Sequence, residues 1–168
     1  IYRESRVGNT VDRTTKILKG CVIGPGVKIG RSCIMKDVVF ADRCVIGDNC
    51  HLTNCYLFGD VKVLDNVKID GAVIGKNVTI KNNVTLHPGV VIGDDCVIGE
   101  NTILNKFTNV VCGNEVIDED DDGFGVDRDG DNDDGNDNFI ETDVSVVGDD
   151  GRGRIWVPQR GDEDSDDD

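Results

Sequence analysis

The chain has 168 residues and a formal net charge of −15, which is enough length for one domain with a well-buried core. The charge is uneven, since residues 1–112 contain 14 Lys and Arg against 11 Asp and Glu, whereas residues 113–168 contain 4 against 22. Nucleic acid is therefore a poor candidate partner, because the acidic part would repel phosphate. No apolar run reaches the roughly 18 residues of a membrane span, so no membrane association is expected.

Residues 1–10 are expected to be a short lead-in. The sequence opens on Ile1 and Tyr2 with neither a start Met nor an apolar signal segment, and a repeat begins within the next ten residues. These features predict a piece of a longer polypeptide, in which the lead-in follows an upstream domain.

Residues 11–112 carry a six-residue repeat led by a medium or large apolar residue, as in VIGPGV at 22–27 and VIGDNC at 45–50. The leading residues are Val11, Ile17, Ile23, Ile29, Ile34, Phe40, Ile46, Leu52, Leu57, Val63, Ile69, Ile74, Ile80, Leu86, Ile92, Ile98 and Leu104. Their spacing is six residues except for steps of five that begin at Ile29, Leu52 and Ile69. If three steps close one coil, the leading residues form three apolar columns, because short strands bury their side chains by stacking. The pattern predicts an all-β parallel β-helix of about five coils.

Gly, Asn and Asp recur between the apolar units, where they supply the tight or left-handed conformations that the corners of a coil need. A β-sandwich is the alternative fold, but its strands alternate in period two with turns about every 8 to 12 residues. Three uniformly apolar columns would then be a coincidence. The repeat does not fix the handedness of the helix, because parallel crossovers are generally right-handed.

Five of the seven cysteines occupy one repeat position that is predicted to point inward: Cys21, Cys33, Cys44, Cys50 and Cys96. They are interpreted as small buried apolar residues in a reducing cytosol. A zinc site is the alternative, and Cys50 and Cys55 have roughly the required spacing, but no Cys-x-x-Cys pair occurs. The sequence therefore predicts no metal site and no cofactor.

Residues 113–168 are predicted to be an acidic disordered linker, because stretches such as EDDDGFGVDRDGDNDD have too little apolar area to offset the entropy of ordering them. Neither possible frame of a calcium loop, from Asp120 or from Asp127, satisfies that motif. Within the linker, a Trp-containing element at 151–157 holds Trp156 between acidic blocks. Trp156 is a candidate contact for a partner or for the β-helix, and a chance hydrophobe is the alternative.

No catalytic residue is predicted. His51 follows an inward Cys and should point outward, and His87 lies beside a Pro-Gly turn. An outward His at a corner is more often exposed than a general base, and the repeat implies no acid next to either one. No glycine-rich phosphate-binding loop precedes a helix in this sequence.

Several segments together resemble the β-helix of the epsilon subunit of eukaryotic translation initiation factor 2B, the guanine-nucleotide exchange factor for initiation factor 2. They are TKILKGCVIGPGVKIG from Thr15, CYLFGDVKV at 55–63 and NNVTLHPG at 82–89, followed by the acidic linker and the Gly-x-Gly-x-x-Trp-like element that ends at Trp156. The resemblance implies a left-handed helix and a cytosolic scaffold in a multisubunit exchange factor.

The resemblance also implies partners. They are the other exchange-factor subunits, especially gamma, and initiation factor 2 through a downstream catalytic domain that these residues do not include. Within CYLFGDVKV, Tyr56 and Phe58 flank an inward Leu57 and are candidate partner contacts. The alternative is the β-helix of a sugar-nucleotide pyrophosphorylase or of a hexapeptide acyltransferase.

Overall fold

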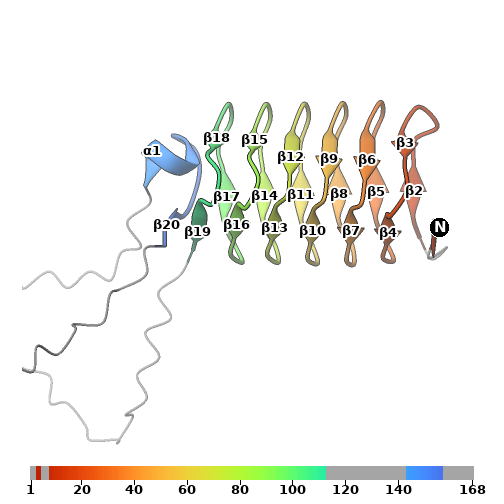
Figure 1. Ribbon diagram of the computed structural model, residues 1–168, viewed down its shortest axis with the longest axis horizontal. Helices are drawn as coiled ribbons and strands as arrows, with labels where there is room; N and C mark the ends of the chain where they lie inside the picture. Colours follow the sequence, from red (N-terminus) through yellow and green to blue (C-terminus); the bar gives the residue numbers. More distant parts are fainter. Residues whose placement is uncertain (1–2, 5–7, 113–142, 157–168) are drawn as a thin grey trace, which may run out of the picture.

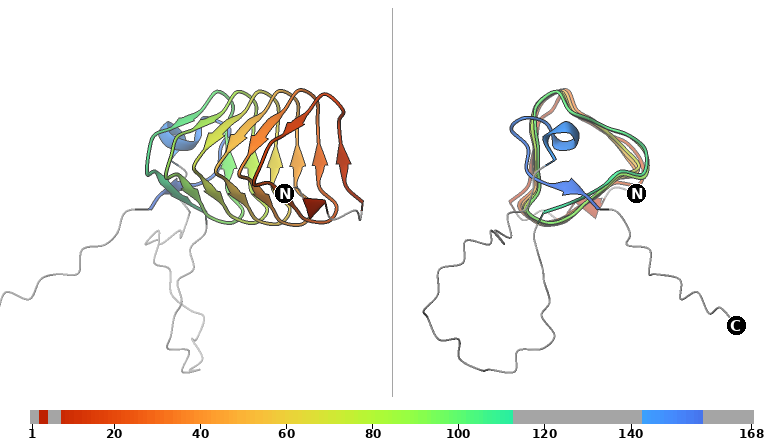
Figure 2. Two further views of the ribbon diagram at one scale, coloured as in Figure 1. Left: turned by 45° about the vertical axis from the view of Figure 1, so that its right-hand side comes forward. Right: turned by 90° about the vertical axis from the view of Figure 1, so that its left-hand side faces the viewer.

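The computed structural model describes residues 3–4, 8–112 and 143–156. Residues 8–112 wind into a parallel β-helix whose three flat sides are sheets of two- and three-residue strands (Figure 1). Seen along its axis, the helix has a triangular cross-section (Figure 2). The predicted all-β parallel β-helix is confirmed.

Each sheet takes one strand from every coil. Sheet A consists of β1 (Arg3–Glu4), β4 (Val22–Ile23), β7 (Val39–Phe40), β10 (Tyr56–Leu57), β13 (Val73–Ile74), β16 (Val91–Ile92), β19 (Asn109–Val111) and β20 (Arg154–Ile155). Sheet B consists of β2 (Thr10–Val11), β5 (Lys28–Ile29), β8 (Val45–Ile46), β11 (Lys62–Val63), β14 (Thr79–Ile80) and β17 (Val97–Ile98). Sheet C consists of β3 (Lys16–Ile17), β6 (Ile34–Lys36), β9 (His51–Thr53), β12 (Lys68–Asp70), β15 (Thr85–Leu86) and β18 (Ile103–Leu104). Sheets B and C have six strands each, and β19 of sheet A, beyond Leu104, completes a sixth coil where the repeat predicted about five.

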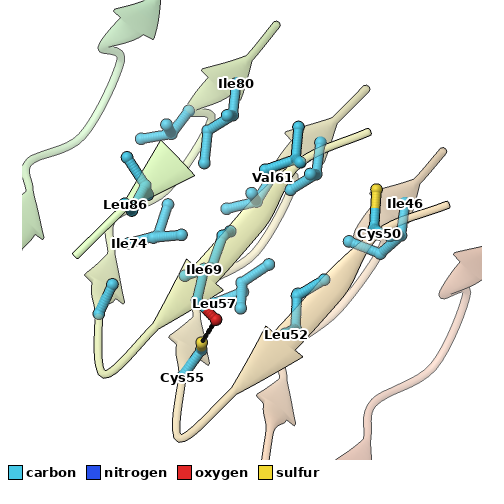
Figure 3. Close-up of a cluster of buried hydrophobic side chains, with 14 of the residues drawn as sticks. Ile46, Cys50, Leu52, Cys55, Leu57, Val61, Ile69, Ile74, Ile80 and Leu86 are labelled. Atoms are coloured by element: carbon cyan, nitrogen blue, oxygen red, sulfur yellow. Dashed lines mark hydrogen bonds between the residues drawn. The ribbon is translucent and has the colours of Figure 1, made fainter. Parts of the chain in front are cut away.

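The core is a continuous stack of apolar side chains inside the prism. Leu52, Leu57, Ile69 and Ile74 come from neighbouring coils and point toward one another (Figure 3). Each coil buries its apolar side chains against those of the coils before and after it, whereas an ordinary sheet buries them against a second layer. The backbone N–H and carbonyl groups form hydrogen bonds between adjacent coils.

The predicted inward cysteines are buried, and the thiols of several of them also donate hydrogen bonds. Cys44 donates to the carbonyl of Phe58 (3.0 Å) and Cys50 to that of Leu64 (3.0 Å), each in the next coil. Cys55 is buried too and donates to the carbonyl of Ile69 (3.5 Å; Figure 3). The thiol thus fills the core and satisfies a backbone oxygen at a corner.

One leading residue was assigned wrongly. Ile34 is 38% exposed, and Met35 takes its place in the core. Side chains alternate along a strand, so a buried Cys33 requires that Met35 point inward. The first five-residue step consequently runs from Met35 to Phe40, at the same corner from sheet C to sheet A as the steps after Leu52 and Ile69.

The prediction of a disordered linker over residues 113–168 is wrong for residues 143–156. These residues form α1 (Val144–Val147) and β20, and Val147 is fully buried against the last coil. Composition predicted disorder because the segment has little apolar area of its own, but it borrows the open end of the β-helix as its core. Residues 113–142 and 157–168 lie outside the described residues, and so does Val157 of the Trp-containing element.

Candidate interaction surface

The outer face of sheet A carries an uncharged apolar row. Its members stand side by side in the strand register: Val22, Val39, Tyr56, Val73 and Val91. We call these five residues the apolar row. Four of them are between 40 and 47% exposed, although their neighbours in sequence on β4, β10, β13 and β16 are buried. A β-helix buries apolar side chains on its inner face, so its core does not require an apolar outer row.

The outer faces of the other two sheets differ from this row. On sheet B the corresponding positions include Lys28 and Lys62, and on sheet C they include Lys16 and Lys68. Lys side chains along exposed strands oppose contact with other proteins, because their charge must be desolvated. Sheet A is therefore the side of the prism best suited to a protein partner.

Tyr56 and Phe58 form the aromatic centre of this face. Their ring centroids are 4.8 Å apart with the planes tilted by 55°, and Phe58 is 37% exposed. Leu57 between them is fully buried, as its inward assignment predicted. Aromatic side chains held by a rigid strand supply a large contact area at low entropic cost. Whether the pair binds a partner stays a prediction.

Trp156 lies on the same face. β20 runs antiparallel to β19 with Val110 opposite Ile155, and the Trp156 N–H donates to the carbonyl of Asn109 (2.9 Å). Residues directly opposite each other share a face, and Asn109 points outward because Val110 is buried. The 50% exposed Trp156 therefore extends the outer face of sheet A. It lies four strand positions from Tyr56, about 19 Å at about 4.8 Å per strand.

The sequence placed Tyr56, Phe58 and Trp156 separately, and the structure brings them to one sheet. The four valines of the apolar row were not singled out, although a signal existed. Each stands directly before an inward residue, and alternation makes it outward.

The two histidines line the same pocket, which the sequence did not predict. A shallow pocket of about 240 Å³ on the outer side of sheet C is lined by His51, Thr53, Lys68, Ile69, Asp70, Thr85, Leu86 and His87. The register of β9 with β12 and of β12 with β15 brings the histidine strands to either side of Asp70, an acid that the repeat alone did not reveal. Among the described residues, no side-chain hydrogen bond joins either His to a carboxylate.

The described part of the chain shows neither a cluster of metal-ligating side chains nor a disulfide. It contains no group of three or more His, Cys, Asp or Glu side chains that could hold a metal ion. All seven cysteines lie in this part, and all are free thiols. Burial raises the pKa of the Cys44 and Cys55 thiols to about 11 each, which keeps them protonated and unreactive near neutral pH.

Over the described residues, no helix is both long and apolar enough to cross a membrane.

Comparison with one solved structure, that of PerB, supports the fold. The chain is similar to PerB of Caulobacter crescentus, whose structure was solved with CoA and GDP-perosamine, at 16% identity and a TM-score of 0.58, with 62% of this chain covering 54% of that one. It is also similar to a putative acetyltransferase from Bacillus cereus, at 16% identity and a TM-score of 0.49, with 66% of this chain covering 73% of that one. The chain thus spans about half the length of PerB, and at 16% identity that likeness extends to the fold alone.

No curated protein matches the chain significantly. A family model, however, matches residues 1–104, and it describes the left-handed β-helix of one subunit of a translation initiation factor, the EIF2B subunit epsilon LbH domain. The match covers more than half of the chain and includes CYLFGDVKV and NNVTLHPG, the segments on which the resemblance rested. The left-handed β-helix expected from that resemblance is thereby confirmed, and the chain belongs to the family of the epsilon-subunit β-helix domain of eukaryotic translation initiation factor 2B.

Proposed function

We propose that this chain is a non-catalytic assembly module of the guanine-nucleotide exchange factor, and that the outer face of sheet A docks another subunit of that factor. Family membership supports a role in a multisubunit translation factor. The observation that carries the finer proposal is the apolar row with Tyr56 and Phe58 at its centre. The partner favoured by the resemblance is the gamma subunit.

The geometry of sheet A suits a flat, ordered partner. Its exposed side chains project from strands whose backbone is paired on both sides from β4 to β16. A rigid surface loses little conformational entropy on binding, so more of the free energy gained from valine and aromatic contacts contributes to affinity. Tyr56 and Phe58 are the expected anchors, and the valines around them exclude water.

Exchange itself is assigned to another part of the factor. To release GDP, an exchange factor must distort the nucleotide site of its GTPase, and the described residues offer sheet faces and corners with no constellation for that work. By resemblance, the activity belongs to a downstream domain that also contacts initiation factor 2, and the whole assembly works in the cytosol. This chain then contributes the connection between subunits.

Co-purification of the tagged chain with the exchange-factor subunits tests the docking face. Tyr56→Asp places a charge in the apolar row, and Val45→Asp places the same charge at an outward mid-stack position of sheet B with similar exposure. We expect the gamma subunit to be recovered with the wild type and with Val45→Asp, and to be lost with Tyr56→Asp. Equal recovery with both variants would remove sheet A as the docking face.

A nucleotide-release assay tests the non-catalytic assignment. The purified chain should leave the rate of GDP release from initiation factor 2 unchanged. Measurable acceleration would overturn the scaffold proposal. The acyltransferase alternative is checked with the same preparation, since turnover of acetyl-CoA abolished by His87→Ala would favour it over an assembly module.

A further inference from the structure

Residues 143–156, which we call the end cap, close the C-terminal end of the β-helix. The chain leaves the last coil at Cys112, and residues 143–156 then lie across the opening, with α1 over the end of the prism (Figure 2). The Val147 side chain is fully buried against the apolar core of the β-helix, and Val146 packs against the same core. The end cap therefore supplies the apolar lid that a seventh coil would otherwise provide.

The end cap also pairs with the last strands of two sheets. On sheet A, β20 lies antiparallel to β19, with Ile155 opposite Val110. On sheet B, Arg152 and Val97 exchange two backbone hydrogen bonds (2.6 and 2.9 Å), and the Gly99 N–H donates to the carbonyl of Val147 (2.5 Å). Those backbone groups belong to strand edges that would be open without the end cap.

Its sequence is suited to this close approach. A Cβ atom at Gly151 would lie 2.1 Å from the carbonyl oxygen of Val147, so only glycine fits there. Asp150 accepts a hydrogen bond from the Glu100 N–H (3.1 Å) and forms a salt bridge with Lys81. Side-chain and backbone contacts together attach the end cap to the penultimate and last coils.

We propose that the end cap blocks an interface through which two copies of this chain would otherwise pair, edge to edge, at β19. The orientation of β20 indicates the partner. A β19 strand related by a two-fold axis would approach the edge antiparallel, as β20 does, and two-fold pairing is the commonest form of self-association. The same two-fold operation would bring together the open core ends of the two copies, each of which is now covered by its own Val147. Backbone pairing and apolar burial would thus both favour a second copy as the partner.

Two valines of α1 provide a matched test in the full chain. Val147 is buried on the inner face of the end cap, whereas Val144 is 51% exposed on the same helix. Val147→Asp should release the end cap and Val144→Asp should leave it in place. Light scattering after size exclusion should then give twice the mass of the 18.2 kDa chain for Val147→Asp, and a single mass for Val144→Asp and the wild type. Amide exchange over residues 143–156 reports release directly.

A second substitution locates the interface. The Asn109 N–H points to the same side of β19 as the Asn109 carbonyl, which accepts a hydrogen bond from the Trp156 N–H. Asn109→Pro therefore removes a donor from the free edge of β19 and leaves the pairing of β19 with β16 intact. Adding it to Val147→Asp should return the mass to that of the monomer.

Three results would overturn the proposal. The first is a monomeric Val147→Asp chain whose end cap exchanges fast. The second is an assembly that Asn109→Pro does not reverse. The third is slow exchange over residues 143–156 in both Val147→Asp and Gly151→Val, because the contacts described here would then not hold the cap in place.

Discussion

The repeat and the end cap meet the same physical demands by different means. Both must bury apolar side chains and pair backbone groups, but the repeat does so with residues that recur at every coil, and the end cap does so once, with Val147 and a few backbone contacts. The repeat carries its own core in its periodicity. The end cap depends on a core built elsewhere, and it should therefore be much easier to detach.

The largest loss of stability is expected for a substitution in the middle of the repeat, where the core belongs to the repeat itself. Ile80 is fully buried between neighbouring coils, and Ile80→Ala should lower the free energy of unfolding by about 2 to 5 kcal/mol through lost burial and the cavity left behind. Lys62→Ala, at an exposed outward position, should cost less than about 0.5 kcal/mol. Chemical denaturation of both variants is the measurement, and similar midpoints would refute the columnar packing.

A smaller and local effect is expected for the end cap. Val147→Ala removes two buried methyl groups, worth about 1.6 kcal/mol at about 0.8 kcal/mol each. Because that burial belongs to the end cap, amide exchange should quicken over residues 143–156 and stay unchanged in the repeat. Uniform quickening along the whole chain would mean that cap and repeat unfold as one unit.

Thr102 links the two regions. It occupies an inward position held by valine or cysteine in the four preceding coils, and its hydroxyl lies 3.3 Å from the carbonyl oxygen of Val147. Thr102→Val should loosen the end cap by about 1 kcal/mol through the lost hydrogen bond, without a cavity in the repeat. Exchange rates of the end cap measure this, and a slower rate than in the wild type would show that packing outweighs the hydrogen bond.

The smallest effect is expected from acid. The hydrogen bond from Lys81 and that from the Glu100 N–H lower the pKa of Asp150 below its ordinary value of 3.8. A carboxylate with a lowered pKa stabilises the folded state above its ordinary pKa, and that contribution is lost as the pH falls through the lowered one. The end cap should therefore exchange faster below about pH 4, and Asp150→Asn should remove that pH dependence. An unchanged profile in Asp150→Asn would exclude this ion pair.

The fold could be predicted because its determinants are periodic. Three apolar columns survive even where one member is misassigned, since Ile34 and Met35 are apolar neighbours and either fits the repeat. The buried Cys33 two positions earlier was the signal that distinguishes them. Periodicity thus fixes the architecture before every register is known.

The candidate surface and the end cap were harder to predict for a physical reason. Tyr56 and Phe58 could be found because they flank an inward leucine, but Trp156 reaches the same face only through the pairing of β20 with β19, which no local pattern encodes. Likewise, the acid between His51 and His87 comes from a neighbouring coil. Contacts between non-repeating segments and coils depend on tertiary structure, and composition alone misjudged them.

The five-residue steps of the repeat always fall at the same corner of the prism, and this position determines how the domain can change in length. Tyr56 stands beside Val73, so the intervening coil is 17 residues long, and all three short steps fall at the corner from sheet C to sheet A. Removing residues 56–72 would delete one complete coil, keep every column aligned and bring the strands on either side into direct register. Removing six residues would rotate all later strands by one side of the prism. Lineages can therefore lengthen or shorten such a domain by whole coils, changing the distance between whatever lies at its two ends while leaving the stacking rule intact.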